Sequence, residues 1–184
     1  AMLEPSMRQR LRIQQQARLE QIESLKYYYR NLGVTADIKA FYTDMPSLLG
    51  QSHLVICRAG ASSVAELAAI GRPSLLLPLP SAMDDHQRMN ALQMQDAGGG
   101  ICLDETNLSA AVLATRLLQL LENPKTLSKM AKSARSLASP DAAGLIAAMA
   151  ENLMAIMQRL LDECSIFASS CGGCRFIFLA PMAV

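Results

Sequence analysis

The stretch that decides the fold is "RAGASSVAELAAIGRP" (58–73), which follows the apolar run "HLVIC" (53–57). The apolar run predicts a buried strand, and the residues after it predict a helix over 62–70 that Gly71 ends and Pro73 cannot continue. One arginine and several small residues stand between the two elements. Small residues let a backbone approach another group closely. The stretch therefore predicts a strand–turn–helix unit with room for a ligand at the turn.

Short apolar runs alternate with helical patterns along the rest of the chain, as in a parallel sheet built from βαβ units. The expected strands are 11–16, 36–42, 53–57, 73–79 and 100–104. The expected helices are 17–33, 44–51, 62–70, 86–98, 109–123, 125–138 and a last one to about residue 162. This order predicts an α/β fold with a doubly wound parallel sheet and C-terminal helices. Ligands of such sheets bind at the carboxyl ends of strands, so the connections after Tyr42, Cys57 and Leu79 are the candidate site.

Composition narrows the class of protein. A chain of 184 residues that is 51% hydrophobic is expected to be globular. Its 17 basic and 16 acidic residues nearly balance, which argues against a nucleic-acid partner. No signal peptide pattern and no apolar stretch of about 20 residues is found, so we expect a cytoplasmic protein without a transmembrane segment.

The cysteines do not predict a metal site or a nucleophile. Cys57 and Cys102 lie in apolar runs, where a thiol behaves as a small hydrophobic side chain. Cys164, Cys171 and Cys174 cluster without a nearby histidine, one ligand short of a closed zinc site. No nucleophile with an adjacent base is found, so no catalytic residue, metal or cofactor is expected.

Two interpretations of the segment after Cys57 remain open. Ser62 and Ser63 stand at the expected helix start, where free backbone N–H groups and the helix dipole suit a phosphate. The spacing from Ser63 to Glu66 also matches a capping box, in which Glu66 only satisfies the helix end. The segment taken alone favours the capping box.

Polar residues also gather after the next expected strand, in "PLPSAMDDHQRMNALQMQ" (78–95). Gln87 and Asn90 carry carboxamides, which offer both a donor and an acceptor and so suit the vicinal hydroxyls of a sugar. Asp84 and Asp85 are alternatively helix caps, and His86 taken alone is expected to be an ordinary surface residue. In the third connection, Phe41 is expected in the core, and Tyr42 at the rim with its backbone near a flat heterocycle.

The paired motifs "CRAGASSVAELAAIGRPSLLLPLP" (57–80) and "DDHQRMNALQMQDAGGG" (84–100) resemble one family closely. They are similar to the C-terminal domain of the family 28 glycosyltransferases of bacterial peptidoglycan synthesis. These enzymes move N-acetylglucosamine from UDP-N-acetylglucosamine to an undecaprenyl-diphosphate-linked muramyl pentapeptide. The resemblance covers about residues 5–143 and implies one Rossmann-like half of a GT-B fold. It implies a partial UDP-sugar-binding domain over 1–145, with a C-terminal helix and an atypical tail over 146–184.

The resemblance also implies roles for the three connections. Tyr42 matches the position that meets the uracil, Glu66 the one that binds the ribose hydroxyls, and His86 and Gln87 the pair near the N-acetylglucosamine hydroxyls. The implied substrate-binding residues are Tyr42, Gly60, Ala61, Ser62, Ser63, Val64, Ala65, Glu66, His86, Gln87 and Asn90. No cofactor or metal is implied, because helix N-termini stabilise the departing UDP.

The match lacks two parts of the family pattern: the acceptor-side domain, and the first strand of this domain with its phosphate loop. In a sheet ordered 3-2-1-4-5-6 that strand is central, so without it the sheet must close the gap, accept another chain or be poorly ordered.

We therefore expect the donor-binding part of a hexosyltransferase of cell-wall synthesis, with the roles in cell shape and division that this implies. Alone it is expected to be weakly active or inactive. In the intact family the protein lies peripherally on the inner face of the cytoplasmic membrane and meets its lipid-linked acceptor through the other domain. The alternatives are another GT-B enzyme that uses a UDP-sugar, or a non-catalytic fragment that binds nucleotide or pairs through its sheet edge.

Overall fold

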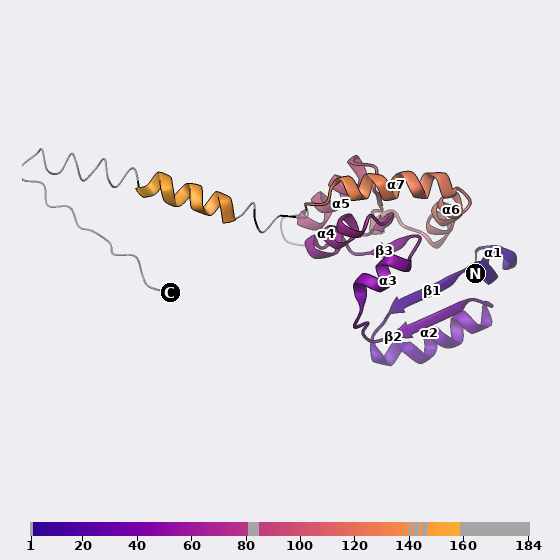
Figure 1. Ribbon diagram of the computed structural model, residues 1–184. Coiled ribbons are helices and arrows are strands. Elements are labelled where there is room, and N and C mark those ends of the chain that lie inside the picture. Colours follow the sequence, from indigo (N-terminus) through magenta and orange to yellow (C-terminus); the bar gives the residue numbers. More distant parts are fainter. Residues whose placement is uncertain (1, 81–84, 140, 142–143, 145–146, 159–184) are drawn as a thin grey trace, which may run out of the picture. The chain divides into compact units, whose positions relative to one another are not determined.

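The computed structural model describes residues 2–80, 85–139, 141, 144 and 147–158 (Figure 1). Contacts divide the chain into two compact units, Ala1–Ala138 and Ser139–Val184. Strands of the first unit are β1 (Arg12–Gln16), β2 (Thr35–Lys39), β3 (Val55–Cys57), β4 (Ser74–Leu76) and β5 (Gly100–Cys102). Its helices are α1 (Pro5–Arg10), α2 (Leu19–Asn31), α3 (Met45–Gln51), α4 (Ala61–Ile70), α5 (His86–Asp96), the 3-10 turn η2 (Glu105–Asn107), α6 (Ala110–Leu121) and α7 (Pro124–Ser136). In the second unit a helix covers 147–158.

The strands form two separate parallel sheets. β1 pairs with β2, and β3, β4 and β5 pair in that order. The expected α/β fold with parallel strands is confirmed. The break between β1 and β3 falls where the resemblance places a central strand, and the two sheets do not close across it.

The open edge of the three-stranded sheet is β3. Val55 N–H donates to Pro73 O at 3.0 Å, and Cys57 O accepts from Leu77 N–H at 2.9 Å, so both residues face β4. Backbone groups alternate along a strand, so the peptide groups of Ile56 face the open edge. The Ile56 side chain is 47% exposed, although strands of a doubly wound sheet are normally covered on both faces.

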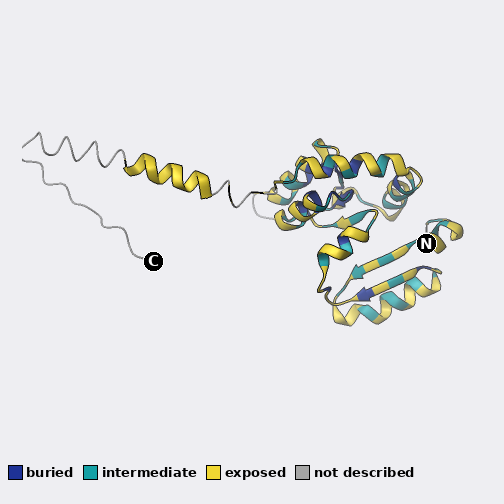
Figure 2. Ribbon diagram, in the orientation of Figure 1, coloured by how far each residue is buried: buried dark blue, intermediate teal, exposed yellow. Residues whose placement is uncertain are grey.

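The core surrounds β4. Leu75 and Leu76 are adjacent on this strand and both fully buried, and their side chains point to opposite faces. One face carries Leu76 with residues of α4, α5 and α7, and the other carries Leu75 with residues of α6 and α7. Figure 2 shows the buried positions gathered among these elements. The packing on both faces fixes the carboxyl ends of β3 and β4, where the candidate site lies.

Most expected elements exist, with shorter strands. β4 ends at Leu76 rather than at residue 79, and Pro78 supplies no N–H group for a longer ladder. Helix α1 was not expected; it begins with Pro5 at its first position, where a missing N–H group costs nothing. No helix in the described part of the chain has the length and apolar content needed to cross a bilayer.

Candidate functional site

The first turn of α4 offers free backbone N–H groups. The cap residue is Gly60, with φ −62° and ψ 149°, and no side chain caps the helix. The first helical bond runs from Val64 N–H to Gly60 O at 3.0 Å. The amides of Ala61, Ser62 and Ser63 therefore have no acceptor within the helix. Together with the positive end of the helix dipole, they suit an anion.

Glu66 does not cap this helix. The cap position is Gly60, which places Ser63 inside the first turn and Glu66 in the second, so the capping-box interpretation is wrong. Among the residues that the structure describes, none forms a hydrogen bond or ion pair with the exposed Glu66 carboxylate. Burial, and then the charge of Glu66, raise the pKa of Cys57 at the end of β3 to about 11. Glu66 is thus available to accept hydrogen bonds from a ligand.

The start of α5 lies beside the loop that precedes α4. Asn90 Nδ2 donates to Ala59 O at 3.0 Å, and Gln87 Oε1 accepts from Leu79 N–H at 3.0 Å. The bond between Asn90 and Ala59 therefore joins the two connections after β3 and β4, which the sequence had placed at the same edge of the sheet. Within the described chain these bonds leave Gln87 Nε2 and Asn90 Oδ1 without a protein partner.

His86 is the first residue of α5 and is exposed. Its neighbour Asp85 is the cap residue, in the left-handed conformation with φ 56°, and its side chain makes no capping hydrogen bond. Asp85 Oδ2 instead lies 3.8 Å from Arg88 Nε. Asp84 and the tail cysteines Cys164, Cys171 and Cys174 lie outside the described residues.

Arg58 has a structural contact that the sequence did not reveal. Its Nη1 and Nη2 atoms donate to Glu105 Oε2 at 2.6 Å and Glu105 Oε1 at 3.2 Å. Nη1 also lies 3.3 Å from Leu77 O and 3.4 Å from Pro78 O. The hydrogen bond from Arg58 lowers the pKa of Glu105. Arg58 therefore holds both η2 and the segment after β4 against the end of β3. Its partner Glu105 is too distant in sequence for any local pattern to indicate the pair.

The third connection reverses the expected burial of its two aromatic residues. Phe41 is 69% exposed, whereas Tyr42 is 9% exposed and its hydroxyl donates to Asp37 O at 2.8 Å. β2 ends at Lys39, so the alternation of a strand does not extend to these residues. Burial is the main cause that raises the pKa of Tyr42. A hollow of about 250 Å³ beside Tyr42 is lined by residues of β1, β2 and α3, among them Gln14 and Ser47.

The groups at these connections suit the binding of a ligand. Free amides suit a diphosphate, an unpaired carboxylate suits vicinal hydroxyls, and the carboxamides suit a sugar. Within the described residues no group of three or more His, Cys, Asp or Glu side chains is placed to hold a metal ion.

Comparison with known proteins gives one family. The model of the glycosyltransferase family 28 C-terminal domain matches residues 3–146. Two UDP-N-acetylglucosamine--N-acetylmuramyl-(pentapeptide) pyrophosphoryl-undecaprenol N-acetylglucosamine transferases are similar to the chain. The one from Rhodospirillum rubrum is 46% identical over 143 residues, which are 78% of this chain and 37% of the relative. The one from Caulobacter vibrioides is 48% identical over 151 residues, 82% of this chain and 42% of the relative.

A crystal structure of Acinetobacter baumannii MurG has a similar fold. Its TM-score is 0.72 at 30% identity, over 80% of this chain and 46% of that chain. The chain thus spans less than half the length of the relatives it matches.

Proposed function

Because the chain belongs to the family of glycosyltransferase family 28 C-terminal domains, we propose that it binds the sugar donor of a hexosyltransferase of peptidoglycan synthesis. The donor is UDP-N-acetylglucosamine, and the acceptor is the lipid-linked muramyl pentapeptide that the names of the relatives specify. The contact between Asn90 and Ala59 is the observation that carries the proposal, because it unites the anion-binding helix start with the carboxamides that suit a sugar.

Each group has a part in this proposal. The free amides at the start of α4 bind the diphosphate, and Glu66 accepts hydrogen bonds from the ribose hydroxyls. Gln87 Nε2, Asn90 Oδ1 and the exposed His86 ring lie toward the N-acetylglucosamine. The uracil lies along the backbone at Tyr42. The dipole of α4 stabilises the charge on departing UDP, while protein outside the matched region supplies the acceptor side at the inner face of the cytoplasmic membrane.

Calorimetric titration of the full chain with UDP-N-acetylglucosamine tests the proposal. Glu66→Ala is expected to weaken binding about 10- to 100-fold, the range for a lost hydrogen bond to a charged group. Its melting temperature should stay unchanged, because Glu66 does not cap α4. Glu20→Ala, which removes an exposed carboxylate from α2, is the matched control. Equal donor affinity in the wild type and Glu66→Ala contradicts the assignment of Glu66.

A non-catalytic role is a second candidate, favoured by the open edge of β3 and the exposed Ile56. In that case the chain binds nucleotide or pairs with another protein through its sheet edge. Size-exclusion chromatography with and without UDP separates the two candidates, since edge pairing gives an assembly that persists without nucleotide and donor binding alone gives none.

A further inference from the structure

The side chain of Arg58 reaches across the carboxyl ends of β3, β4 and β5. Arg58 directly follows the last residue of β3, and its Nη1 atom lies 3.3 Å from Leu77 O and 3.4 Å from Pro78 O, which follow β4. The same guanidinium donates to both carboxylate oxygens of Glu105, the first residue of η2, which follows β5. One side chain therefore links the segments that leave the three paired strands.

The segment that directly follows β4 is held mainly by side chains. Leu77 N–H donates to the end of β3 at 2.9 Å, but Pro78 has no N–H group to continue the pairing. Among the described residues, no backbone–backbone hydrogen bond holds Pro78 or Leu79. The carbonyls of Leu77 and Pro78 instead contact Arg58. Leu79 N–H donates to Gln87 Oε1 at 3.0 Å.

Leu79 determines which atom of the Gln87 carboxamide is left for a ligand. A backbone N–H group can only donate, so the atom of Gln87 that meets it is the oxygen Oε1. The amide nitrogen Nε2 is then free to donate, and within the described residues it has no protein partner. The terminal torsion of a glutamine side chain has broad preferences, so without this bond the carboxamide could present either atom.

Helix α5, which carries Gln87, is also anchored without this segment. Its Asn90 donates to the loop before α4 at 3.0 Å, and its Gln95 accepts from Cys102 N–H of β5 at 2.9 Å. Neither bond involves Arg58. Loss of the Arg58 contacts should therefore release the Gln87 side chain and leave the helix in place.

We propose that Glu105 is a positioning residue for sugar recognition. It holds Arg58 across the end of β4, Arg58 fixes the segment at Leu79, and Leu79 orients the Gln87 amide nitrogen toward the sugar of the donor. The side chains of Arg58 and Glu105 are 46% and 44% exposed, so their ion pair adds little to stability, whereas its two-point contact fixes geometry. The inference rests on the proposed function, in which Gln87 lies beside the N-acetylglucosamine.

Calorimetric titration of the full chain with UDP-N-acetylglucosamine and with UDP tests the inference. UDP lacks the sugar, so the ratio of the two dissociation constants measures sugar recognition, while an effect of the Arg58 charge on the diphosphate enters both constants. Glu105→Ala is expected to reduce the preference for UDP-N-acetylglucosamine about 2- to 10-fold, the range for one hydrogen bond between uncharged groups. Arg58→Lys should do the same, because lysine keeps the charge but cannot reproduce the two-point contact of a guanidinium. An unchanged ratio in either variant overturns the proposal.

A double-variant comparison shows whether Glu105 acts through Gln87. Gln87→Ala removes the carboxamide itself and sets the full size of the effect. Gln87→Ala/Glu105→Ala should lose no more preference than Gln87→Ala alone, because the group that Glu105 positions is already absent. Losses that multiply contradict the proposal, since Glu105 then acts on the sugar by another route.

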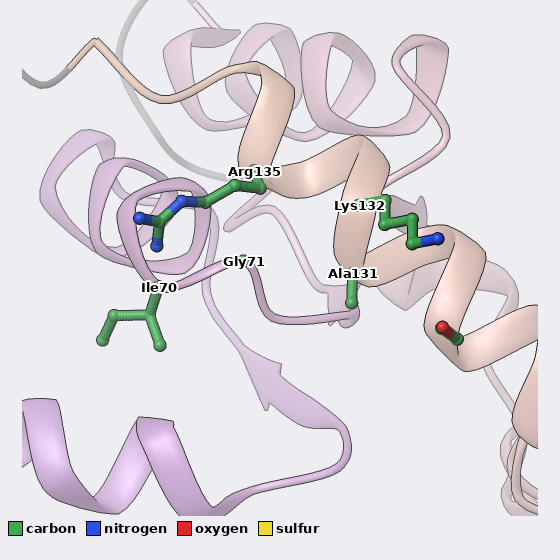
Figure 3. A pocket seen from close by; sticks show the side chains of 6 residues that line it. Ile70, Gly71, Ala131, Lys132 and Arg135 are labelled. Carbon is green, nitrogen blue, oxygen red and sulfur yellow. The ribbon is translucent and has the colours of Figure 1, made fainter.

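Arg135→Lys is the matched control. Arg135 Nη1 also donates to a backbone carbonyl, that of Ala69 near the end of α4, and Figure 3 shows its side chain extending toward this helix. This contact lies beside a hollow of about 370 Å³ lined by Gly71 and Lys132, among others, and at the opposite end of α4 from the free amides. The control should leave the ratio of dissociation constants unchanged. A fall equal to that of Arg58→Lys means that the ratio follows general stability, and it overturns the proposal.

Hydrogen exchange of the ligand-free chain separates this inference from the proposed function. In Glu105→Ala the Leu79 amide should exchange at least about threefold faster, because the segment that holds it against Gln87 is loosened. The Cys102 amide, whose acceptor is Gln95, should be unaffected. A wild type with equal affinity for UDP and UDP-N-acetylglucosamine contradicts the proposed function. A normal preference in the wild type with unchanged Leu79 exchange in Glu105→Ala contradicts only this inference.

Discussion

The side-chain amide of Asn90 donates to the backbone carbonyl of Ala59 at 3.0 Å and so ties the first turns of α5 to the loop before α4. Ala59 is fully buried, so water cannot replace this donor without a rearrangement. This hydrogen bond between α5 and the loop before α4 therefore helps to set the position of the carboxamides relative to the free amides of α4. This bond gives the site a shape before any ligand arrives.

Asn90→Ala is expected to lower the free energy of unfolding by about 1–3 kcal/mol, because it leaves the buried Ala59 carbonyl without a donor. Urea denaturation measures the change. Gln93→Ala, an exposed position on the same helix, serves as control and should change stability by no more than about 0.5 kcal/mol. Similar losses in the two variants show that the bond to Ala59 contributes nothing.

Glu105→Gln is expected to make stability less sensitive to acid. Arg58 lowers the pKa of Glu105 in the folded protein. The ion pair therefore stabilises the fold fully at pH values above 4.5, which is the ordinary glutamate pKa and applies to the unfolded chain. This contribution to stability disappears as the pH falls through the lowered pKa of Glu105 in the folded protein. Urea midpoints at pH 7 and about pH 3.5 should differ more for the wild type than for the variant. An equal change of the urea midpoint between the two pH values in the wild type and the variant excludes a link between the Glu105 ion pair and acid sensitivity.

Gly99→Ala is expected to destabilise the domain by about 2–4 kcal/mol. An added Cβ meets Met94 Sδ and Ala134 Cα, both at 2.7 Å, and the latter belongs to the backbone of α7 and cannot move freely. Gly50→Ala is the control, because nothing lies within 4 Å of its added Cβ and alanine favours a helix. Thermal melting should show a lower midpoint for Gly99→Ala and an unchanged or higher one for Gly50→Ala. Equal melting midpoints for the two variants would falsify the close approach of the Gly99 backbone to α7.

Hydrogen exchange at β3 is expected to differ between adjacent residues. Val55 N–H donates to Pro73 O, whereas the amide of Ile56 faces the open edge. In the isolated chain Val55 should exchange at least about a hundredfold more slowly than Ile56 in NMR exchange experiments. A chain that adds a strand at this edge should protect Ile56 and leave Val55 unchanged. Equal protection of both amides in the isolated chain means that the edge is already covered.

The alternation of apolar runs and helical patterns was enough to predict the α/β class and the parallel strands, because both follow from local periodicity. The resemblance of two linked motifs predicted the family and the absence of a central strand, but it left open whether the sheet would close the gap that this strand leaves. The contacts of Arg58 with Glu105 and of Asn90 with Ala59 were not predictable, since each joins residues that are distant in sequence. The burial of Phe41 and Tyr42 was mispredicted because β2 ends earlier than the apolar pattern does.

Gly60 begins α4 without a side chain that could close the helix end. A serine or aspartate there would strengthen the helix by occupying one of its first amide groups. The same amide would then be lost to the diphosphate that we propose binds there, so in this proposal helix strength and ligand affinity compete for one set of donors. A chain selected for stability alone would carry a capping side chain at this position, whereas Gly60 leaves the first amide groups of α4 uncapped.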